Sequence, residues 1–342
     1  MLAYKFYWER TKCGEARLLR AFGQSAKAVL PTEIEGVALT EIGAYCFAEP
    51  SRLPEYYEVA EVSEEPQALA GESGVALQAE AGNVSRLHEL SGNYIEAIDL
   101  PDTVQKVGNL AFYRCASLRE LAVGRSLIQV GSDVFMNCQS LYRITLRCGR
   151  GEQSGLRQIL AQITHDLEVT FLEEGAVWAK LLFPEYCESY DEIAPAHVFG
   201  RNIEGEGFRA RQCLREGIVD FAQYDKIFQK ARAEESERTL CSLALNRLRY
   251  PVELGVAEKE LYMEYLRGHA MAVCKDAALR RNVRPVQFLC EMGLACRSDL
   301  EEAIRVCAKA EWAEGTASFL RFVEKYFPRT QGERYGFADF YM

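Results

Sequence analysis

The chain has 342 residues, long enough for two domains, and is 49% hydrophobic and 11% aromatic, which suffices for packed cores. Its formal net charge is −10. That charge argues against nucleic acid and anionic membranes as partners, because both attract a basic surface. The composition therefore predicts a folded protein and excludes the strongly basic classes of binding protein.

Residues 1–24 are predicted to form a first strand and a turn that cap the repeats described below. The first ten residues lack the sustained apolar core of a signal peptide, because Glu9 and Arg10 interrupt them. No stretch approaches the length needed to span a bilayer. We therefore expect a cytoplasmic protein with no membrane partner.

One pattern occurs over residues 107–118 and again over 130–141, so that each of its positions recurs after a fixed period. Each copy has Val-Gly, a phenylalanine and Cys-x-x-Leu, and each continues into alternating residues typical of a strand. Ile98 and Leu100 supply an earlier strand in the same register. Because one repeat cannot bury its apolar face alone, the period predicts a solenoid whose strands form a short parallel sheet.

The alternation also predicts which side chains point away from the core. They form two rows across the strands, namely Ala97, Glu120 and Arg143, and then Asp99, Ala122 and Thr145. Interface hot spots favour aromatic residues and arginine, so Tyr142 and Arg143 are the predicted anchors. The full set of predicted binding residues is Ala97, Asp99, Glu120, Tyr142, Arg143 and Thr145.

These motifs resemble the BspA-type leucine-rich repeat family, whose unit contains Ala-Phe-x-x-Cys-x-x-Leu. Ala111 and Phe112 keep the Ala-Phe pair, and residues 29–47 carry a further copy, so the resemblance covers about residues 25–148 with a gap. It implies a leucine-rich-repeat solenoid that acts as a binding scaffold. Family members are best known as bacterial surface and adhesion proteins. The gap, near residues 50–94, is either a solvated insertion or degenerate coils, and its Pro, Glu and Ser content favours the insertion.

Residues 149–217 are predicted to close the solenoid and to bridge to a second domain, with a helix over 156–163 and a strand over 167–172. The glycine-rich run 200–207 precedes Arg209 and Arg211, which would allow an anion cradle. No Gly-Lys-Ser/Thr follows and two glutamates interrupt the run, so a plain loop is the favoured interpretation.

Residues 218–327 have helical spacing of apolar residues, and a motif around Phe288 recurs around Phe319. Helix pairs at this spacing resemble ankyrin-type repeats, which implies stacked helix hairpins, although an ordinary helical bundle fits equally well. Residues 298–301 are predicted to be a capping box that starts a helix. The aromatic tail 328–342 either packs back on these helices or binds a partner.

The sequence predicts no cofactor and no metal site. No Cys-x-x-Cys pair occurs, the four histidines are scattered, and the twelve cysteines are expected to be reduced, mostly buried thiols. No motif of a known catalytic class is present. The best candidate for a catalytic site comprises Glu185, Asp191, Glu192 and His197, although a polar inter-domain linker is the favoured interpretation of these residues.

We therefore predict an α+β protein in which an N-terminal β-rich leucine-rich-repeat solenoid precedes an all-α helical-repeat domain. The expected segments are 1–148, 149–217, 218–327 and 328–342. The predicted function is a non-enzymatic scaffold for a protein or peptide, without nucleic acid. The alternatives are a cell-surface adhesin and an enzyme with its site at the inter-domain junction.

Overall fold

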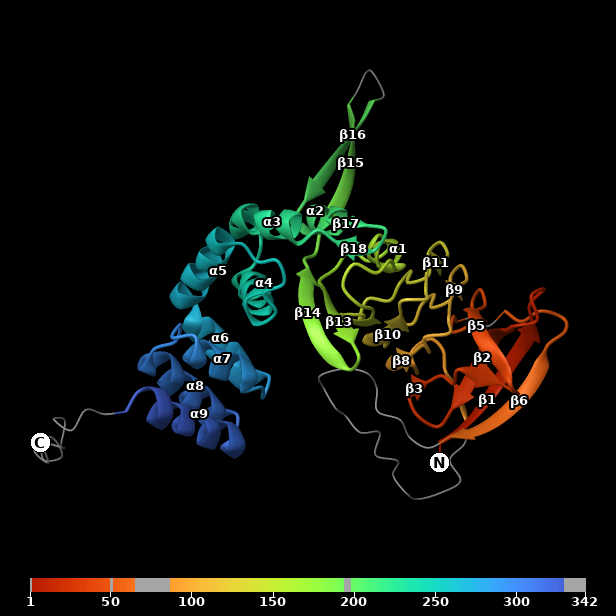
Figure 1. Cartoon of the computed structure of the whole chain (residues 1–342), viewed down its shortest axis with the longest axis horizontal. Helices are drawn as coiled ribbons and strands as arrows, with labels where there is room; N and C mark the ends of the chain where they lie inside the picture. Colours follow the sequence, from red (N-terminus) through yellow and green to blue (C-terminus); the bar gives the residue numbers. More distant parts are fainter. Residues whose placement is uncertain (1, 50–51, 65–86, 194–197, 329–342) are drawn as a thin grey trace, which may run out of the picture. The chain divides into compact units, whose positions relative to one another are not determined.

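The computed structural model describes residues 2–49, 52–64, 87–193 and 198–328 (Figure 1). The chain forms two compact units, Met1–Glu235 and Ser236–Met342. Every strand of the described residues lies in the first unit, and the described part of the second contains helices alone. The predicted α+β class, with a β-solenoid followed by helices, is confirmed.

An antiparallel sheet precedes the repeats. Its central strand β1 (Leu2–Arg10) pairs with β2 (Ala16–Gly23) on one side and β6 (Glu58–Glu64) on the other. The short strand β7 (His88–Glu89) pairs with the end of β2. Trp8 is fully buried, so this sheet contributes a core of its own.

The solenoid has one longer parallel sheet, continued at one edge by an antiparallel strand. The predicted register is confirmed, because Leu121 lies opposite Ile98 on one side and Ile144 on the other. The strands in spatial order are β3 (Lys27–Val29), β8 (Ala97–Asp99), β10 (Glu120–Gly124), β12 (Arg143–Arg147), β13 (Leu167–Glu173) and the antiparallel β14 (Ala176–Phe183).

A second row of short parallel strands lies on the other side of the coils and joins the N-terminal sheet. It comprises β5 (Val37–Ile42), β9 (Lys106–Val107) and β11 (Gln129–Val130). β5 also pairs with β2 and with β4 (Glu33–Ile34). The first coil therefore stacks directly on the coil of the 107–118 repeat. The described strands between these coils, β6 and β7, pair with β1 and β2 of the N-terminal sheet, so they add no degenerate coil.

The repeated phenylalanines and cysteines form the interior of the coils. Phe112 stacks on Phe47 with ring centroids 4.8 Å apart and on Phe135 at 5.7 Å. The Cys115 thiol donates to the Phe47 carbonyl at 3.1 Å, and the Cys138 thiol donates to the Phe112 carbonyl at 3.0 Å. Each cysteine thus satisfies a buried carbonyl of the preceding coil, which explains why the motif contains it.

Glycine is required where the coils approach each other most closely. A Cβ atom at Gly108 would lie 2.5 Å from the Ala44 nitrogen, and one at Gly131 would lie 2.6 Å from the Asn109 nitrogen. No side chain fits at such distances, so Val-Gly marks a contact between coils as well as a bend.

A short helix closes the repeat. In α1 (Leu156–Leu160) and the turn after it, Gln158 and Gln162 extend their amides to the last coil. Their oxygens accept from the Val130 and Val134 nitrogens at 2.8 and 2.7 Å. Their nitrogens donate to the Ile128 and Gly131 carbonyls at 3.1 and 2.8 Å. Side-chain amides therefore replace the main chain of a further coil and satisfy the open edge.

The remainder of the first unit contains two hairpins and two helices. The glycine-rich run 200–207, predicted to be a loop, is a strand over residues 200–204, because residues 198–204 pair along their length with residues 187–193 to form the longer hairpin. The elements are β15 (Cys187–Ile193), β16 (Val198–Glu204), α2 (Gly207–Gln212), β17 (Leu214–Arg215), β18 (Ile218–Val219) and α3 (Phe221–Glu234).

Arg211, one of the two arginines behind this run, is used by the fold itself. Arg211 is 4% exposed, and its guanidinium donates to the carbonyls of five residues of the first unit. Burial lowers the pKa of Arg211 to about 10, so the side chain is still protonated at neutral pH. The five acceptors are Leu160, Ile163, His165, Pro184 and Gly207.

Helix α3 belongs to the first unit, although the sequence grouped it with the helices that follow. Its Phe221 and Tyr224 rings contact Trp178 and Phe183 of β14 with centroids 6.2 and 5.9 Å apart. The Tyr224 hydroxyl donates to the Leu182 carbonyl. The division between the units therefore falls after Glu235.

The second unit is built from helix pairs. α4 packs on α5, α6 on α7 and α8 on α9, while α4, α6 and α8 form one row of neighbours. None of the described helices is both long enough and apolar enough to cross a bilayer. The bounds are α4 (Glu237–Arg249), α5 (Val256–Gly268), α6 (Ala270–Leu279), α7 (Arg284–Glu291), α8 (Arg297–Lys309) and α9 (Ala313–Tyr326).

The buried positions of these helices recur at a constant interval along the chain. Cys241, Cys274 and Cys307 are equally spaced on α4, α6 and α8, and all three are buried. The interval read from the sequence, from Phe288 to Phe319, does not join equivalent positions throughout, because Leu289 is buried and its predicted counterpart Leu320 is 48% exposed.

The predicted capping box at residues 298–301 is displaced by two residues. Cys296 is the N-cap of α8, and its main-chain nitrogen donates to Asp299 at 2.8 Å. Asp299 therefore occupies the third helical position, which is where an acidic side chain reaches back to the cap. The 328–342 tail lies outside the described residues beyond Pro328.

Candidate binding face of the solenoid

A row of alternating charges crosses four strands of the longer sheet. Arg143 on β12 pairs with Glu120 on β10 at 2.8 Å and with Glu168 on β13 at 3.4 Å. Lys180 on β14 then pairs with Glu168 at 3.0 Å. The parallel register produces this row, since it places Glu120, Arg143 and Glu168 directly opposite one another. Burial by itself would lower the pKa of Arg143, but Glu168 and Glu120 outweigh it and raise that pKa.

Tyr142 stands beside this row and is 44% exposed. Its hydroxyl donates to Glu120 at 3.1 Å, and the Arg143 guanidinium lies 5.2 Å from the centre of its ring. Burial of the hydroxyl raises the pKa of Tyr142, so the phenol stays protonated and keeps this hydrogen bond. Tyr142 is therefore an aromatic side chain that is held in place and still accessible.

Three of the predicted binding residues are not on the surface. Ala97, Asp99 and Thr145 are exposed by 3%, 7% and 4%, so the expectation that they point to solvent is wrong. Arg147 helps to cover the row of Asp99, Ala122 and Thr145. It reaches from β12 across β10 and pairs with Asp99 at 2.7 Å and with Asp102 at 2.6 Å.

Glycine makes this crossing possible. A Cβ atom at Gly124, the residue opposite Arg147 on β10, would lie 2.8 Å from the Asp102 Cα. Burial would lower the pKa of Arg147, but Asp99 and Asp102 raise it further than burial lowers it. The guanidinium therefore remains charged and keeps both carboxylates paired.

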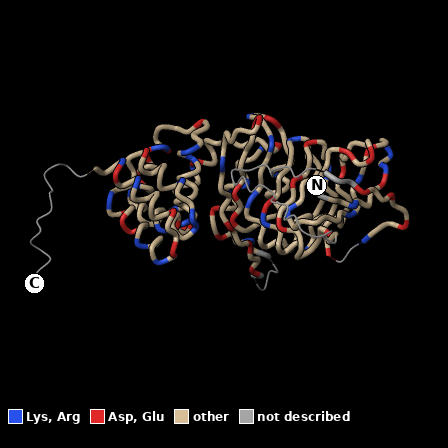
Figure 2. Tube along the Cα trace, turned by 90° about the horizontal axis from the view of Figure 1, so that it is seen from below, with Lys and Arg blue, Asp and Glu red and all other residues tan. Residues whose placement is uncertain are grey.

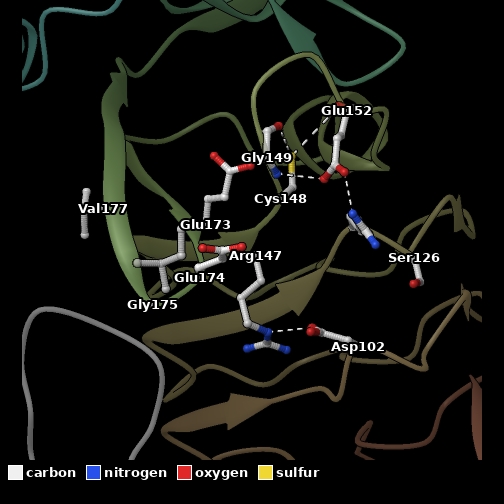
Figure 3. Close-up of a pocket in the computed structure, with 12 residues that line it drawn as sticks. Asp102, Ser126, Arg147, Cys148, Gly149, Glu152, Glu173, Glu174, Gly175 and Val177 are labelled. Carbon is white, nitrogen blue, oxygen red and sulfur yellow. Dashed lines mark hydrogen bonds and ion pairs between the residues drawn. The ribbon is translucent and has the colours of Figure 1, made fainter.

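A cavity of about 730 Å³ opens where the parallel strands end (Figure 3). Arg147 and Asp102 lie on one side of it, and Glu152 lies on another, where it pairs with Arg125 (Figure 3). The remaining lining mixes two carboxylates, those of Glu173 and Glu174, with glycines and small or apolar side chains. The lining residues are Asp102, Arg125, Ser126, Arg147, Cys148, Gly149, Glu152, Leu172, Glu173, Glu174, Gly175 and Val177.

The only thiol in this cavity is unsuited to nucleophilic chemistry. Cys148 is 5% exposed and donates to the Gly149 carbonyl at 3.2 Å. Burial, with help from Glu152 and Glu173, raises its pKa to about 11. The thiolate is the reactive form, so Cys148 is almost entirely inert at neutral pH. Within the residues that the structure describes, no three His, Cys, Asp or Glu side chains are grouped to hold a metal ion.

Two of the four titratable residues predicted for a junction enzyme can be placed, and neither lines the cavity at the strand ends. Glu185 is exposed just before β15, and Asp191 is exposed within β15. The Glu192 side chain and His197 lie outside the part of the chain that the structure describes. Asp191 instead accepts from Asn202 across the hairpin.

Sequence reasoning missed Arg147, Asp102, Glu168 and Lys180. A usable signal existed for Arg147, because it lies two positions after Thr145 in the same alternation. No local signal shows that Arg147 pairs with Asp102 and Asp99, since these residues lie 45 and 48 positions earlier in the chain.

Comparison with known proteins finds a family of repeats in the residues that form the coils. Residues 89–154 match the family model of the BspA type leucine rich repeat region, in 6 copies. The part of the solenoid from β7 to the turn after β12 is therefore similar to BspA-type repeats. The crystal structure of the T. pallidum leucine rich repeat protein TpLRR is similar over 41% of this chain and 68% of that chain, at 17% identity and a TM-score of 0.21. A likeness of that size supports no argument. No curated protein matches the chain.

Proposed function

We propose that this protein is a non-enzymatic scaffold that binds a protein or peptide on the strand face of its solenoid, with Tyr142 as the anchor. The observation that carries the proposal is Tyr142 itself, which is 44% exposed yet fixed by Glu120 and Arg143. Tyrosine and arginine dominate binding hot spots, and a side chain that is already ordered loses little entropy on binding. BspA-type repeats support the proposal, because stacked repeats present extended surfaces.

The charges of the strand face indicate which kind of surface its partner presents. The row from Glu120 to Lys180 alternates in sign, so a complementary surface must also carry both signs. In Figure 2 basic and acidic residues are interspersed along both units, which fits a protein partner better than a polyanion. We also propose that binding takes place in the cytoplasm, where the nine buried thiols remain reduced.

The test compares two single tyrosine variants. Tagged wild type, Tyr142→Ala and Tyr190→Ala are used to capture proteins from a lysate of the native cell. Tyr190 is a matched control, because it is 63% exposed on β15. We expect a retained protein that Tyr142→Ala loses and Tyr190→Ala keeps, with at least tenfold weaker binding by Tyr142→Ala in a titration. Equal retention by all three proteins contradicts the strand face as the binding site.

A cell-surface adhesin is the second candidate, and the BspA-type repeats are the observation that favours it. Protease treatment of intact native cells separates the two. Loss of the protein from intact cells supports the adhesin, and protection until the cells are lysed supports the cytoplasmic scaffold.

A further inference from the structure

A second hollow crosses three coils at a different edge of the solenoid, at the turns that follow the stacked phenylalanines. Its volume is about 640 Å³. We call it the turn groove. It is lined by Glu49, Asn93, Arg114, Ala116, Asn137 and Gln139.

The turn groove is a product of the repeat. Glu49, Arg114 and Asn137 each lie two positions after a stacked phenylalanine, so they form one ladder across the coils. The Glu49 nitrogen donates to the Tyr113 carbonyl at 3.3 Å, and the Arg114 nitrogen donates to the Met136 carbonyl at 2.9 Å. These bonds hold the ladder at the spacing of the coils, about 4.8 Å.

A second ladder forms the other wall. Asn93, Ala116 and Gln139 are separated by one repeat period each, so they occupy the same position in successive coils. Asn93 and Gln139 carry amides, whereas Ala116 between them has only a methyl group. This small residue opens the middle of the groove opposite Arg114.

The polar side chains of the groove are not used by the fold. Among the described residues, no hydrogen bond or ion pair is made by the side chains of Glu49, Asn93, Arg114, Asn137 or Gln139. Glu49 and Arg114 carry opposite charges on adjacent coils and still do not pair. Within the described part of the chain, the Arg114 guanidinium lies 5.9 Å from the centre of the neighbouring Tyr113 ring and forms no ion pair.

Arg114 also occupies an unfavourable main-chain position. Its φ is +62°, and the equivalent Asn137 has φ +65°. Asparagine adopts this left-handed region readily, but for arginine it costs about 1–2 kcal/mol. Leu110 of the same coil has φ +56° as well, so left-handed turns belong to the coils, and from one of them Arg114 places its side chain in the groove.

We propose that the turn groove binds an extended polar segment of a polypeptide that carries an acidic residue opposite Arg114. A polypeptide main chain alternates N–H donors and C=O acceptors. Asn93, Asn137 and Gln139 can serve both, Arg114 binds the carboxylate, and Glu49 accepts from N–H groups. No large apolar side chain lines the groove. The ligand is therefore recognised by its main chain and its charge, and its other side chains are small or polar.

This site is separate from the strand face around Tyr142 and does not depend on the function proposed there. The probe is a displayed library of random dodecapeptides, selected on the full chain and depleted on Ala116→Leu, which fills the hollow. Synthetic copies of the enriched peptides are then titrated against wild type, Ala116→Leu, Arg114→Ala and Gln139→Ala.

Two matched controls complete the experiment. Ala161→Leu adds the same side chain at an exposed alanine directly after α1, and Arg119→Ala removes an exposed arginine outside the groove. We expect acidic enriched peptides that bind Ala116→Leu and Arg114→Ala at least tenfold more weakly than wild type. Both controls should bind within twofold of wild type, and all variants should keep the wild-type melting temperature.

Three outcomes overturn the proposal. The first is that no peptide is enriched on wild type over Ala116→Leu. The second is that enriched peptides bind every variant equally. The third is that a saccharide on a glycan array, and no peptide, is bound in an Ala116- and Arg114-dependent manner, which would assign the groove to a carbohydrate.

Discussion

Arg147 links the strand face to the cavity at its end. Its side chain is 22% exposed and contacts two carboxylates and a carbonyl on an earlier coil, those of Asp99, Asp102 and Leu100. The Asp99 side chain is only 10% exposed. Removal of one partner from such a pair leaves the other charge buried, and that penalty exceeds the net value of the pair itself.

We therefore expect Arg147→Ala to lower the free energy of unfolding by about 2–3 kcal/mol, because Asp99 loses its counter-ion. The measurement is urea unfolding at pH 7. Arg125→Ala is the control. Arg125 pairs with Glu152, but its side chain is 62% exposed, so its removal should lower the free energy of unfolding by at most about 0.5 kcal/mol. Similar losses in the two variants would show that Arg147 is not a structural clamp.

The cysteines provide a test that depends on pH. Cys13, Cys187 and Cys296 are exposed and the other nine are buried. With a pKa raised to about 11 by burial, Cys148 is about 0.1% thiolate at pH 8. Native protein should therefore alkylate at three positions with iodoacetamide at pH 8, and at all twelve in guanidinium chloride, as read by mass spectrometry.

The raised pKa of Cys148 also determines how the free energy of unfolding changes with pH. The folded pKa of Cys148 lies above its ordinary value, so the neutral thiol contributes stability below about pH 9. That contribution is lost as the pH rises through about 11. Rapid labelling of Cys148 at pH 8 would contradict the burial that causes the shift.

At the scale of elements, α1 shows how a solenoid can end without a further strand. Gln158 and Gln162 are one helical turn apart, and each makes one donated and one accepted hydrogen bond with the last coil. An amide is the side-chain group that can replace both halves of a peptide unit. The helix thus protects an edge that would otherwise be open to another chain.

Each single variant, Gln158→Ala or Gln162→Ala, should destabilise the first unit by about 1–2 kcal/mol, because two main-chain groups lose their partners. Hydrogen exchange of the Val130 and Val134 amides should also become faster. Arg157→Ala, on the exposed side of the same helix, should change neither property. Unchanged exchange in the glutamine variants would mean that the clamp is not formed.

At the scale of the whole molecule, each unit has its own core. The second unit buries Tyr262, Leu266 and the three equally spaced cysteines of α4, α6 and α8. Helix α3 is buried through Phe221 and Phe228 within the first unit. The position of the boundary therefore decides which fragments can fold.

We expect a fragment of residues 236–342 to be monomeric, helical by circular dichroism and cooperative in thermal unfolding. A fragment that starts at residue 218 carries α3 without β14, so it exposes Phe221, Tyr224 and Phe228 and should aggregate. Light scattering during size exclusion measures both. A well-behaved longer fragment beside an unfolded shorter one would move the boundary back to the sequence-derived position.

Local periodicity determined much of this protein. The repeat period set the coil, the register of β8, β10 and β12, and the phenylalanine interior, because residues one period apart face the same neighbours in a stack. The alternation also placed Glu120 and Arg143 on the outer side, and both are half-buried there, whereas Tyr142 was chosen for its residue type and not for its place in the alternation.

Only the tertiary structure decided the rest. Burial of Ala97, Asp99 and Thr145, the Arg147 clamp, the pairing of β3 with β8 and the placement of α3 all depend on contacts between residues distant in the chain. Alternation says which side of a strand a residue faces, but it does not say what lies over that side. A long arginine from two strands away covers Asp99, and no local pattern contains that information.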